Sequence, residues 1–151
     1  MVDSRRYFDK IHPAFPILDQ AGVMKAYRQG ALPHALTCEI YAVSILFWRL
    51  SPAIIESGRP RPDVHYIWNL AVSAMHKDFL SPTFSTVLAC ILDIWGRPIS
   101  SVTYNAVNIG STVALAQSLG LNRDPSKWSL DDRQKSLRIR TWWGLLIHDY
   151  W

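Results

Sequence analysis

Cysteine and long apolar runs are both scarce in this chain of 151 residues. The two cysteines, Cys38 and Cys90, lie in apolar stretches, which is typical of buried free thiols in a reducing compartment and excludes a cysteine-rich metal cluster. No run of about 18 or more apolar residues is present, so the sequence predicts no membrane-spanning helix. Residues 1–10 are charged rather than apolar, so no secretory signal is visible.

Sequence signatures of catalysis are also absent. There is no nucleophile elbow of the G-x-S-x-G type, no glycine-rich phosphate loop and no H-E-x-x-H zinc motif. His34 and Cys38 are spaced to share a helix face as metal ligands do, but no second pair completes a site, which favours a satisfied pair. His148 and Asp149 are neighbours, and neighbours in a helix point about 100 degrees apart. We therefore predict no enzyme activity and no metal or cofactor in this chain.

The chain is rich in apolar and aromatic residues. Hydrophobic residues make up 49% of it, and seven residues are tryptophans, which we expect to anchor mainly the core and otherwise a partner surface. The net charge of +4 is uneven, and residues 123–140 hold six basic and three acidic side chains, a local +3. An i,i+4 ion pair between Asp131 and Lys135, and a cation–π contact between Arg138 and Trp142, favour a solvated helix face there over a nucleic-acid surface.

Helical spacing and helix-end signals recur along the chain and predict an all-α protein of about six or seven helices joined by short turns. We expect helices over residues 3–11, 19–29, 33–50, 64–79, 82–96, 101–119 and from Ser129 onward. Residues 51–62 hold three prolines and a glycine, which predicts a mobile loop. The predicted buried face of the sixth helix holds Val102, Ala106, Ile109, Val113 and Ala116. Gly110 within it costs about 1 kcal/mol relative to alanine and predicts a close helix approach or, less commonly, a gap that faces a ligand.

Helix-end signals are strongest near the C-terminal end. Leu119-Gly120-Leu121 is typical of a helix stop, because glycine takes the left-handed backbone and the next apolar residue folds back on the last turn. Ser129 is predicted to cap the following helix, with two aspartates in its first turn. Ser81, ahead of a proline, and either Ser100 or Ser101 are predicted to cap two earlier helices.

Three segments resemble one protein family. Residues 116–125 read AQSLGLNRDP, Trp128 and Ser129 follow, and a basic helix then carries Trp142-Trp143. This order resembles the middle homology region of the fungal zinc-cluster transcription factors, which follows their DNA-binding zinc cluster. The positions that match its motif are Leu119, Gly120, Leu121, Arg123, Asp124, Arg138, Arg140, Trp142, Trp143 and Asp149. The chain departs from the family at Asn122, where histidine is usual, and at Ile139, which separates two arginines that are often adjacent.

The other two segments lie earlier in the chain. Residues 7–18, YFDKIHPAFPIL, are similar to the segment that opens the same domain, and Ser81-Pro82-Thr83 is similar to the start of one of its helices. Within the family, the sequence is most similar to regulators of nitrogen-source utilisation. We expect His12, ahead of Pro13, to stabilise a turn, and Asp149 to accept a hydrogen bond from an arginine or a helix end.

The resemblance implies the regulatory middle domain of a nuclear transcription factor, which controls activation through contacts with itself or with other regulators, in nitrogen or carbon metabolism. Zinc and DNA binding are implied only for the six-cysteine cluster, which this chain lacks. A small-metabolite sensor within such a regulator is the alternative, although no cluster of polar residues in the sequence marks a pocket. An unrelated helical scaffold, or an enzyme with an unrecognised site, is the third hypothesis.

The apolar helical pattern runs as far as Trp151, whereas the family domain continues beyond its Trp-Trp helix. We therefore expect residues 1–151 to be a single helical domain that is a truncated part of a larger regulatory domain. Because each helix depends on its neighbours for apolar burial, the isolated chain is expected to be marginally stable or self-associating.

Overall fold

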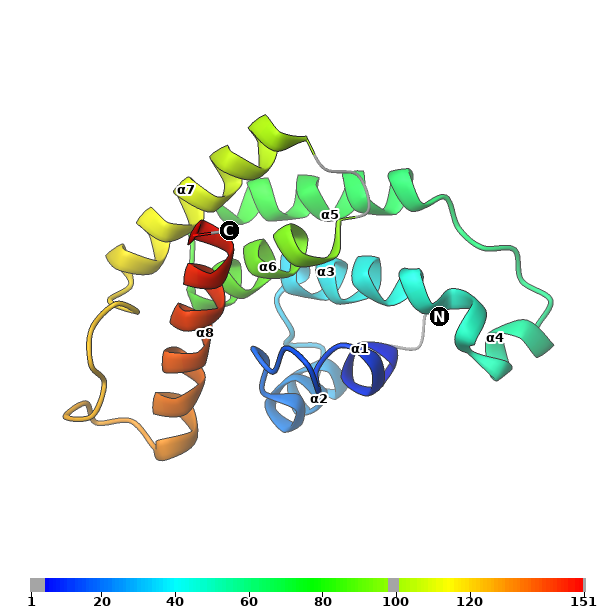
Figure 1. Cartoon of the computed structure of the whole chain (residues 1–151). Helices are drawn as coiled ribbons and strands as arrows, with labels where there is room; N and C mark the ends of the chain where they lie inside the picture. The colour runs from blue at the N-terminus through cyan, green and yellow to red at the C-terminus, as the bar shows by residue number, and fades with distance from the viewer. Residues whose placement is uncertain (1–4, 98–100, 151) are drawn as a thin grey trace.

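The computed structural model describes residues 5–97 and 101–150, and every regular element in these ranges is helical (Figure 1). The elements are α1 (Arg5–Lys10), α2 (Gln20–Arg28), α3 (His34–Ser44), the 3-10 helix η1 (Ile45–Leu50), α4 (Pro52–Glu56), α5 (Val64–Asp78), α6 (Phe84–Gly96), α7 (Val102–Ser118) and α8 (Asp132–Tyr150). The predicted all-α fold is confirmed, and six of the described α-helices have seven or more residues. Within these residues, none of the helices is both long enough and apolar enough to span a membrane.

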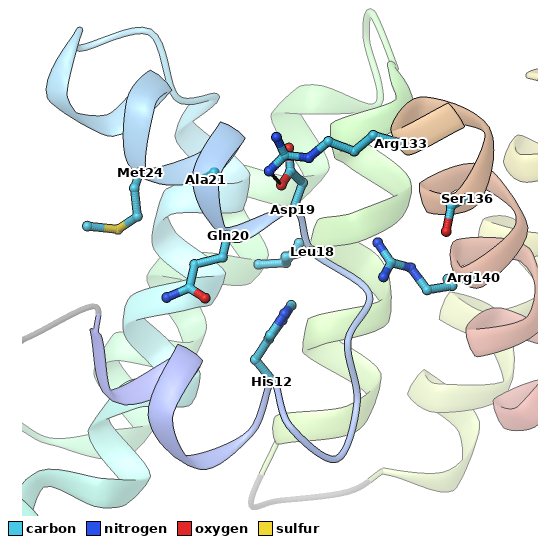
Figure 2. A pocket seen from close by; sticks show the side chains of 9 residues that line it. All are labelled: His12, Leu18, Asp19, Gln20, Ala21, Met24, Arg133, Ser136 and Arg140. Carbon is cyan, nitrogen blue, oxygen red and sulfur yellow. Dashed lines mark hydrogen bonds and ion pairs between the residues drawn. The ribbon is translucent and has the colours of Figure 1, made fainter. Parts of the chain in front are cut away.

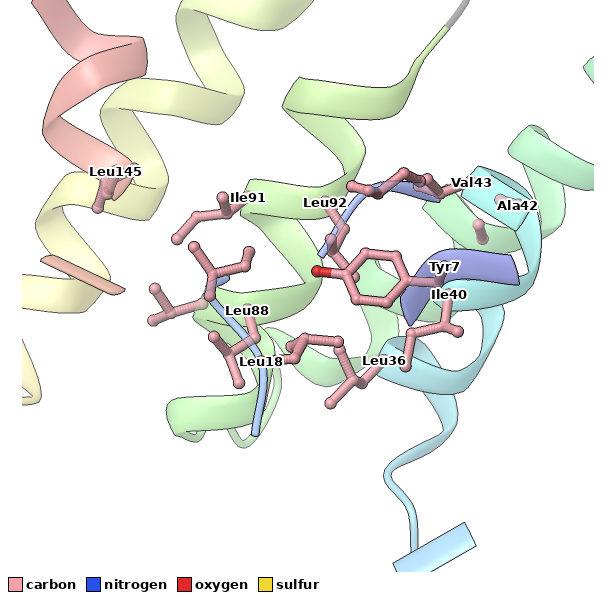
Figure 3. Close-up of a cluster of buried hydrophobic side chains, with 14 of the residues drawn as sticks. Tyr7, Leu18, Leu36, Ile40, Ala42, Val43, Leu88, Ile91, Leu92 and Leu145 are labelled. Carbon is pink, nitrogen blue, oxygen red and sulfur yellow. The ribbon is translucent and has the colours of Figure 1, made fainter. Parts of the chain in front are cut away.

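Helix α6 lies at the centre of the packing, because α3, α5, α7 and α8 all contact it (Figure 1). Every residue from Thr86 to Asp93 is buried, so α6 is covered on all sides. The main apolar cluster joins α6 to α1, α3, α8 and the segment after α1 (Figure 3). Its members include Tyr7, Leu18, Leu36, Ile40, Val43, Leu88, Ile91, Leu92 and Leu145.

Most tryptophans do not anchor this core, so that expectation is wrong. Trp68 is buried, whereas Trp95 and Trp143 are exposed. The half-buried tryptophans are Trp48, Trp128 and Trp142, and Trp151 lies outside the described residues. The aromatic residues near the C-terminal end stay at the surface because α8 lies at an edge of the array, where only one of its faces is covered (Figure 1).

Two predicted segments differ from the structure. The helix predicted over residues 33–50 ends at Ser44, because the backbone of Phe47 (φ −101°, ψ 18°) leaves helical geometry within η1. The loop predicted over residues 51–62 contains the short helix α4. A proline starts that helix at its first position, where the missing N–H has no partner to lose.

The helix caps agree with the sequence in one case and differ in two. Ser101 caps α7 by accepting a hydrogen bond from Tyr104 N, and the alternative Ser100 lies outside the described residues. Helix α6 is capped by Thr83 rather than Ser81, because Thr83 and Thr86 form a reciprocal capping box. The predicted cap Ser129 lies in the preceding loop, since Asp131 accepts from Gln134 N at 2.7 Å and starts α8.

The buried face of α7 also differs from the predicted one. Val102 is 84% exposed and Ala106 is exposed, whereas Asn108 and Thr112 are buried. An apolar pattern assigns polar side chains to solvent, but these two are buried because they form hydrogen bonds. The predicted close approach at Gly110 is wrong, because a Cβ there would meet nothing within 4 Å.

A close approach to α8 occurs at Gly144, against a segment that is not helical. A Cβ at Gly144 would lie 3.0 Å from Cγ2 of Ile17 and 3.3 Å from the ring of Phe15. Glycine at this position therefore lets α8 lie against the segment that follows α1. That contact places the segment that follows α1 beside α8, although the two are far apart in the sequence.

Candidate functional site

The turn between α7 and α8 has the geometry expected from its sequence. Gly120 has a φ of +71°, and Leu121 N donates to Ala116 O at 2.9 Å. Leu121 is buried against the core, and Leu119 packs beside it. In the following turn, Asp124 accepts hydrogen bonds from the backbone N and the hydroxyl of Ser126, which lower the pKa of its carboxyl. This part of the family motif therefore fixes a corner between two helices.

Arg138 fastens α8 to that corner. Its guanidinium lies 5.1 Å from the ring centroid of Trp128 and 5.5 Å from that of Phe84, and it donates to Leu119 O at 3.5 Å. The predicted contact with Trp142 is therefore wrong, because helical side chains lean toward the N-terminal end of their helix. The predicted ion pair between Asp131 and Lys135 is also absent, since the Lys135 side chain donates to Ser126 O instead.

The remaining motif residues are dispersed. Arg123 and Asp149 are exposed. The hydrogen bond predicted for the Asp149 carboxylate, from an arginine or a helix end, is not formed by any of the described residues. His148 instead packs against the ring of Phe15, with centroids 5.6 Å apart, and burial lowers its pKa. The turn at Pro13 is held by backbone bonds, such as Phe15 N to Ile11 O at 3.0 Å, rather than by the side chain of His12.

Two motif residues, His12 and Arg140, meet at an open cavity of about 610 Å³ between the N-terminal segment and α8 (Figure 2). The sequence shows no cluster of polar residues that marks a pocket, but the fold brings such residues together here. The residues that line the cavity are His12, Leu18, Asp19, Gln20, Ala21, Met24, Arg133, Ser136 and Arg140.

The charged groups of the cavity are unevenly paired. The Arg133 guanidinium forms an ion pair with Asp19, whose side chain forms no cap hydrogen bond at the start of α2. Arg140 is exposed, and no acceptor in the described residues binds its guanidinium. Figure 2 shows the imidazole of His12 and the guanidinium of Arg140 on either side of the opening. The positive charge of Arg133 is therefore neutralised by Asp19, whereas the guanidinium of Arg140 is free to bind a ligand.

His12 contributes a neutral ring to this cavity. The imidazole packs against Phe8, with centroids 5.3 Å apart, and Nδ1 is buried without a hydrogen-bond partner. Burial lowers the pKa of His12, the positive charge of Arg140 lowers it further, and Asp19 acts in the opposite direction. Because Nδ1 has no acceptor, we assign the proton of the neutral ring to Nε2.

A second polar cluster is buried between α3, α6 and α7. Asp93 is fully buried, forms an ion pair with Arg97, and accepts hydrogen bonds from Tyr104 Oη at 3.2 Å and Asn108 Nδ2 at 2.8 Å. The Arg97 guanidinium also lies 4.2 Å from the Tyr104 ring centroid. Burial nevertheless keeps the pKa of Asp93 above its ordinary value. This cluster joins α6 to α7 through hydrogen bonds.

Glu39 lies beside this cluster without a hydrogen-bond partner for either carboxylate oxygen. Burial raises the pKa of Glu39 well above its ordinary value, Asp93 raises it further, and Arg97 lowers it. The sequence offered one signal for these groups, since Glu39 and Asp93 are isolated acids within apolar helices. Both acids are enclosed by packed helices, so we interpret the cluster as structural.

The two candidate metal ligands, His34 and Cys38, lie together without further ligands from the described residues. His34 and Cys38 share one face of α3, with Cys38 Sγ 3.7 Å from His34 Nε2. In residues 5–97 and 101–150, no group of three or more His, Cys, Asp or Glu side chains is placed to hold a metal ion. Cys38 and Cys90 are free thiols.

Helix α8 carries an apolar surface on the side away from its buried residues Thr141 and Leu145. The spacing of the exposed residues is helical, so they form one continuous row. We call this row the α8 stripe, and its members are Ile139 (44% exposed), Trp143 (62%), Ile147 (53%) and Tyr150 (80%).

Comparison with known proteins gives a consistent result. Residues 5–151 match the model of a family described as the fungal specific transcription factor domain. The chain is 30% identical over 148 residues to a transcriptional regulatory protein of Schizosaccharomyces pombe, and 31% identical over 148 residues to the transcriptional activator protein DAL81 of Saccharomyces cerevisiae. Each alignment covers 96% of this chain but only 22% and 15% of these two relatives. No solved structure matches the chain.

Proposed function

The chain belongs to the fungal specific transcription factor domain family, and we propose that it controls transcriptional activation through contacts between its helices and other protein segments. The relatives are named as transcriptional regulators, which supports a regulatory role in transcription. We further propose that it acts in the nucleus, in the regulation of nitrogen or carbon metabolism. Specific DNA contacts would belong to a zinc-cluster domain, for which this chain has too few cysteines.

The α8 stripe is the observation that carries the proposal. Contiguous exposed apolar side chains mark interaction surfaces, whereas single exposed apolar residues are ordinary. Tryptophan and tyrosine are enriched among the residues that dominate interface energetics. The stripe combines both features, and α8 is held in place from its other side by Arg138 and Leu145. Its occupant would be an apolar protein segment, either from the same regulator or from another one.

A transcription assay tests this proposal. We expect the chain, fused to a heterologous DNA-binding domain in fungal cells, to change reporter transcription relative to that domain alone. Trp143→Asp combined with Ile147→Asp is expected to abolish the change, because the loss of a dominant interface residue costs about 2 kcal/mol or more, roughly 30-fold in affinity.

Leu80→Asp is the matched control, since Leu80 is 90% exposed outside the stripe and is expected to leave transcription unchanged. The proposal fails if the stripe variant, at equal abundance and with an unchanged circular dichroism spectrum, regulates as the unmodified fusion does.

The cavity favours a second candidate function, the sensing of a small metabolite. Its volume of about 610 Å³ lies within the range of about 300–1,000 Å³ that is usual for ligand sites. It is lined by both apolar and polar side chains, and α8 forms one wall. A ligand bound there would therefore contact the helix that carries the stripe.

A further inference from the structure

The charge of the cavity between the N-terminal segment and α8 is compatible with one anionic group. Arg133 and Arg140 contribute two positive charges, and Asp19 contributes one negative charge, which leaves one positive charge in excess. The excess lies at Arg140, because Arg133 is already paired with Asp19. An arginine guanidinium offers a planar array of donors that matches a carboxylate with two parallel hydrogen bonds.

Two neutral donors stand near that arginine. Ser136 lies one turn before Arg140 on α8, so both side chains share the helix face that lines the cavity (Figure 2). His12 faces them from the N-terminal segment, and its Nε2–H is free to donate because no described residue forms a hydrogen bond with the ring.

The rest of the lining is compatible with the remainder of a small molecule. Leu18, Ala21 and Met24 supply apolar surface from the segment around the start of α2. A bound group would therefore meet donors from α8 and His12, and both apolar surface and the Gln20 amide from the segment around the start of α2 (Figure 2).

We propose that this cavity binds a small monocarboxylate with an aliphatic body, with the carboxylate held by Arg140, Ser136 and the Nε2–H of His12. The proposal deepens the metabolite-sensing candidate function and rests on it. A single excess positive charge favours a monoanion over the doubly charged phosphate group. An aliphatic body would displace water from the apolar side of the cavity.

Titration followed by two-dimensional NMR of the chain tests the proposal, with isovalerate as the probe and isovaleramide as its neutral isostere. Isovalerate is expected to shift the resonances of residues 12–24 and 133–140 in a saturable manner, and isovaleramide is expected not to. Arg140→Gln is expected to weaken isovalerate binding about tenfold or more, as is usual for the loss of a charged hydrogen-bond partner.

Arg123→Gln is the matched control, because Arg123 is exposed and does not line the cavity. It is expected to bind isovalerate as the unmodified chain does, and Ser136→Ala is expected to weaken binding less than Arg140→Gln. The proposal is overturned if isovalerate shifts no cavity resonance, if isovaleramide binds equally, if both arginine variants lose affinity equally, or if inorganic phosphate alone binds.

The reporter assay separates this result from the sensing function itself. Binding of isovalerate without a change in reporter transcription would support the cavity assignment and count against sensing. A transcriptional response to carboxylates that is unchanged in Arg140→Gln would support sensing and overturn the cavity assignment.

Discussion

Replacement of Asp93 by leucine is expected to lower the free energy of unfolding by about 3–5 kcal/mol, the range for removal of one partner of a buried ion pair. Asp93 is fully buried, and its carboxylate binds Arg97, Tyr104 and Asn108. Leucine removes the carboxylate oxygens that accept from these three donors, which leaves the Arg97 guanidinium, itself largely buried, without its partner. Urea denaturation followed by circular dichroism measures the loss.

Two variants control this result. Asp149→Leu also removes an aspartate from a helix, but Asp149 is exposed, so its substitution is expected to change stability by no more than about 0.5 kcal/mol. Asp93→Leu combined with Arg97→Met is expected to recover much of the loss, because no unpaired buried charge remains. A stability of Asp93→Leu within about 1 kcal/mol of the unmodified chain would show that the ion pair is not structural.

Replacement of Glu39 by methionine is expected to have the opposite effect and to raise the free energy of unfolding by about 1–3 kcal/mol near neutral pH. Both carboxylate oxygens of Glu39 are buried without hydrogen-bond partners, so their loss of hydration on folding is uncompensated. Methionine has a similar length and carries no group that requires such a partner.

The pH dependence of stability distinguishes this explanation from a general packing effect. Burial raises the pKa of folded Glu39 well above the ordinary value of 4.5, so the folded chain binds a proton that the unfolded chain has released. The stability contribution of this group is therefore fully present below that value and is lost as the pH rises toward the folded pKa.

We expect the advantage of Glu39→Met to grow between about pH 4.5 and pH 8, as measured by urea denaturation across this range. Glu39→Gln is the matched control, because it cannot ionise but retains a buried polar group, and it is expected to show less pH dependence with a smaller gain. If Glu39→Met were the less stable protein at about pH 8, the carboxylate would be stabilising, and the explanation would be wrong.

Local signals in the sequence predicted most helix positions and the corner between α7 and α8. Gly120 has the left-handed backbone that its sequence context predicts, because helix stops depend on a few adjacent residues. The caps differed where two suitable residues lie close together, as with Ser129 and Asp131. The three family segments were recognisable in order, and the match of the family model to residues 5–151 confirms that resemblance.

The cavity and the buried polar cluster could not be predicted in this way. The ion pair of Asp19 with Arg133 joins residues 114 positions apart, and no local pattern connects them. Asn108 and Thr112 are polar, so a hydrophobic pattern assigns them to solvent. Asn108 is nevertheless buried, because it donates to Asp93 on another helix. The exposure of Trp143 likewise depends on the position of α8 at the edge of the array, and no local pattern in the sequence predicts that position.

Cross-linking at position 143 tests the central claim, that the α8 stripe is a protein-contact surface, most directly. A photo-reactive amino acid would replace Trp143 in the fusion protein in fungal cells, with the same group at position 80 as the exposed control. We predict that position 143 cross-links to a defined protein segment, that position 80 does not, and that Ile147→Asp abolishes the product. Equal labelling at both positions, or no product at position 143, would contradict the assignment of the stripe as an interface.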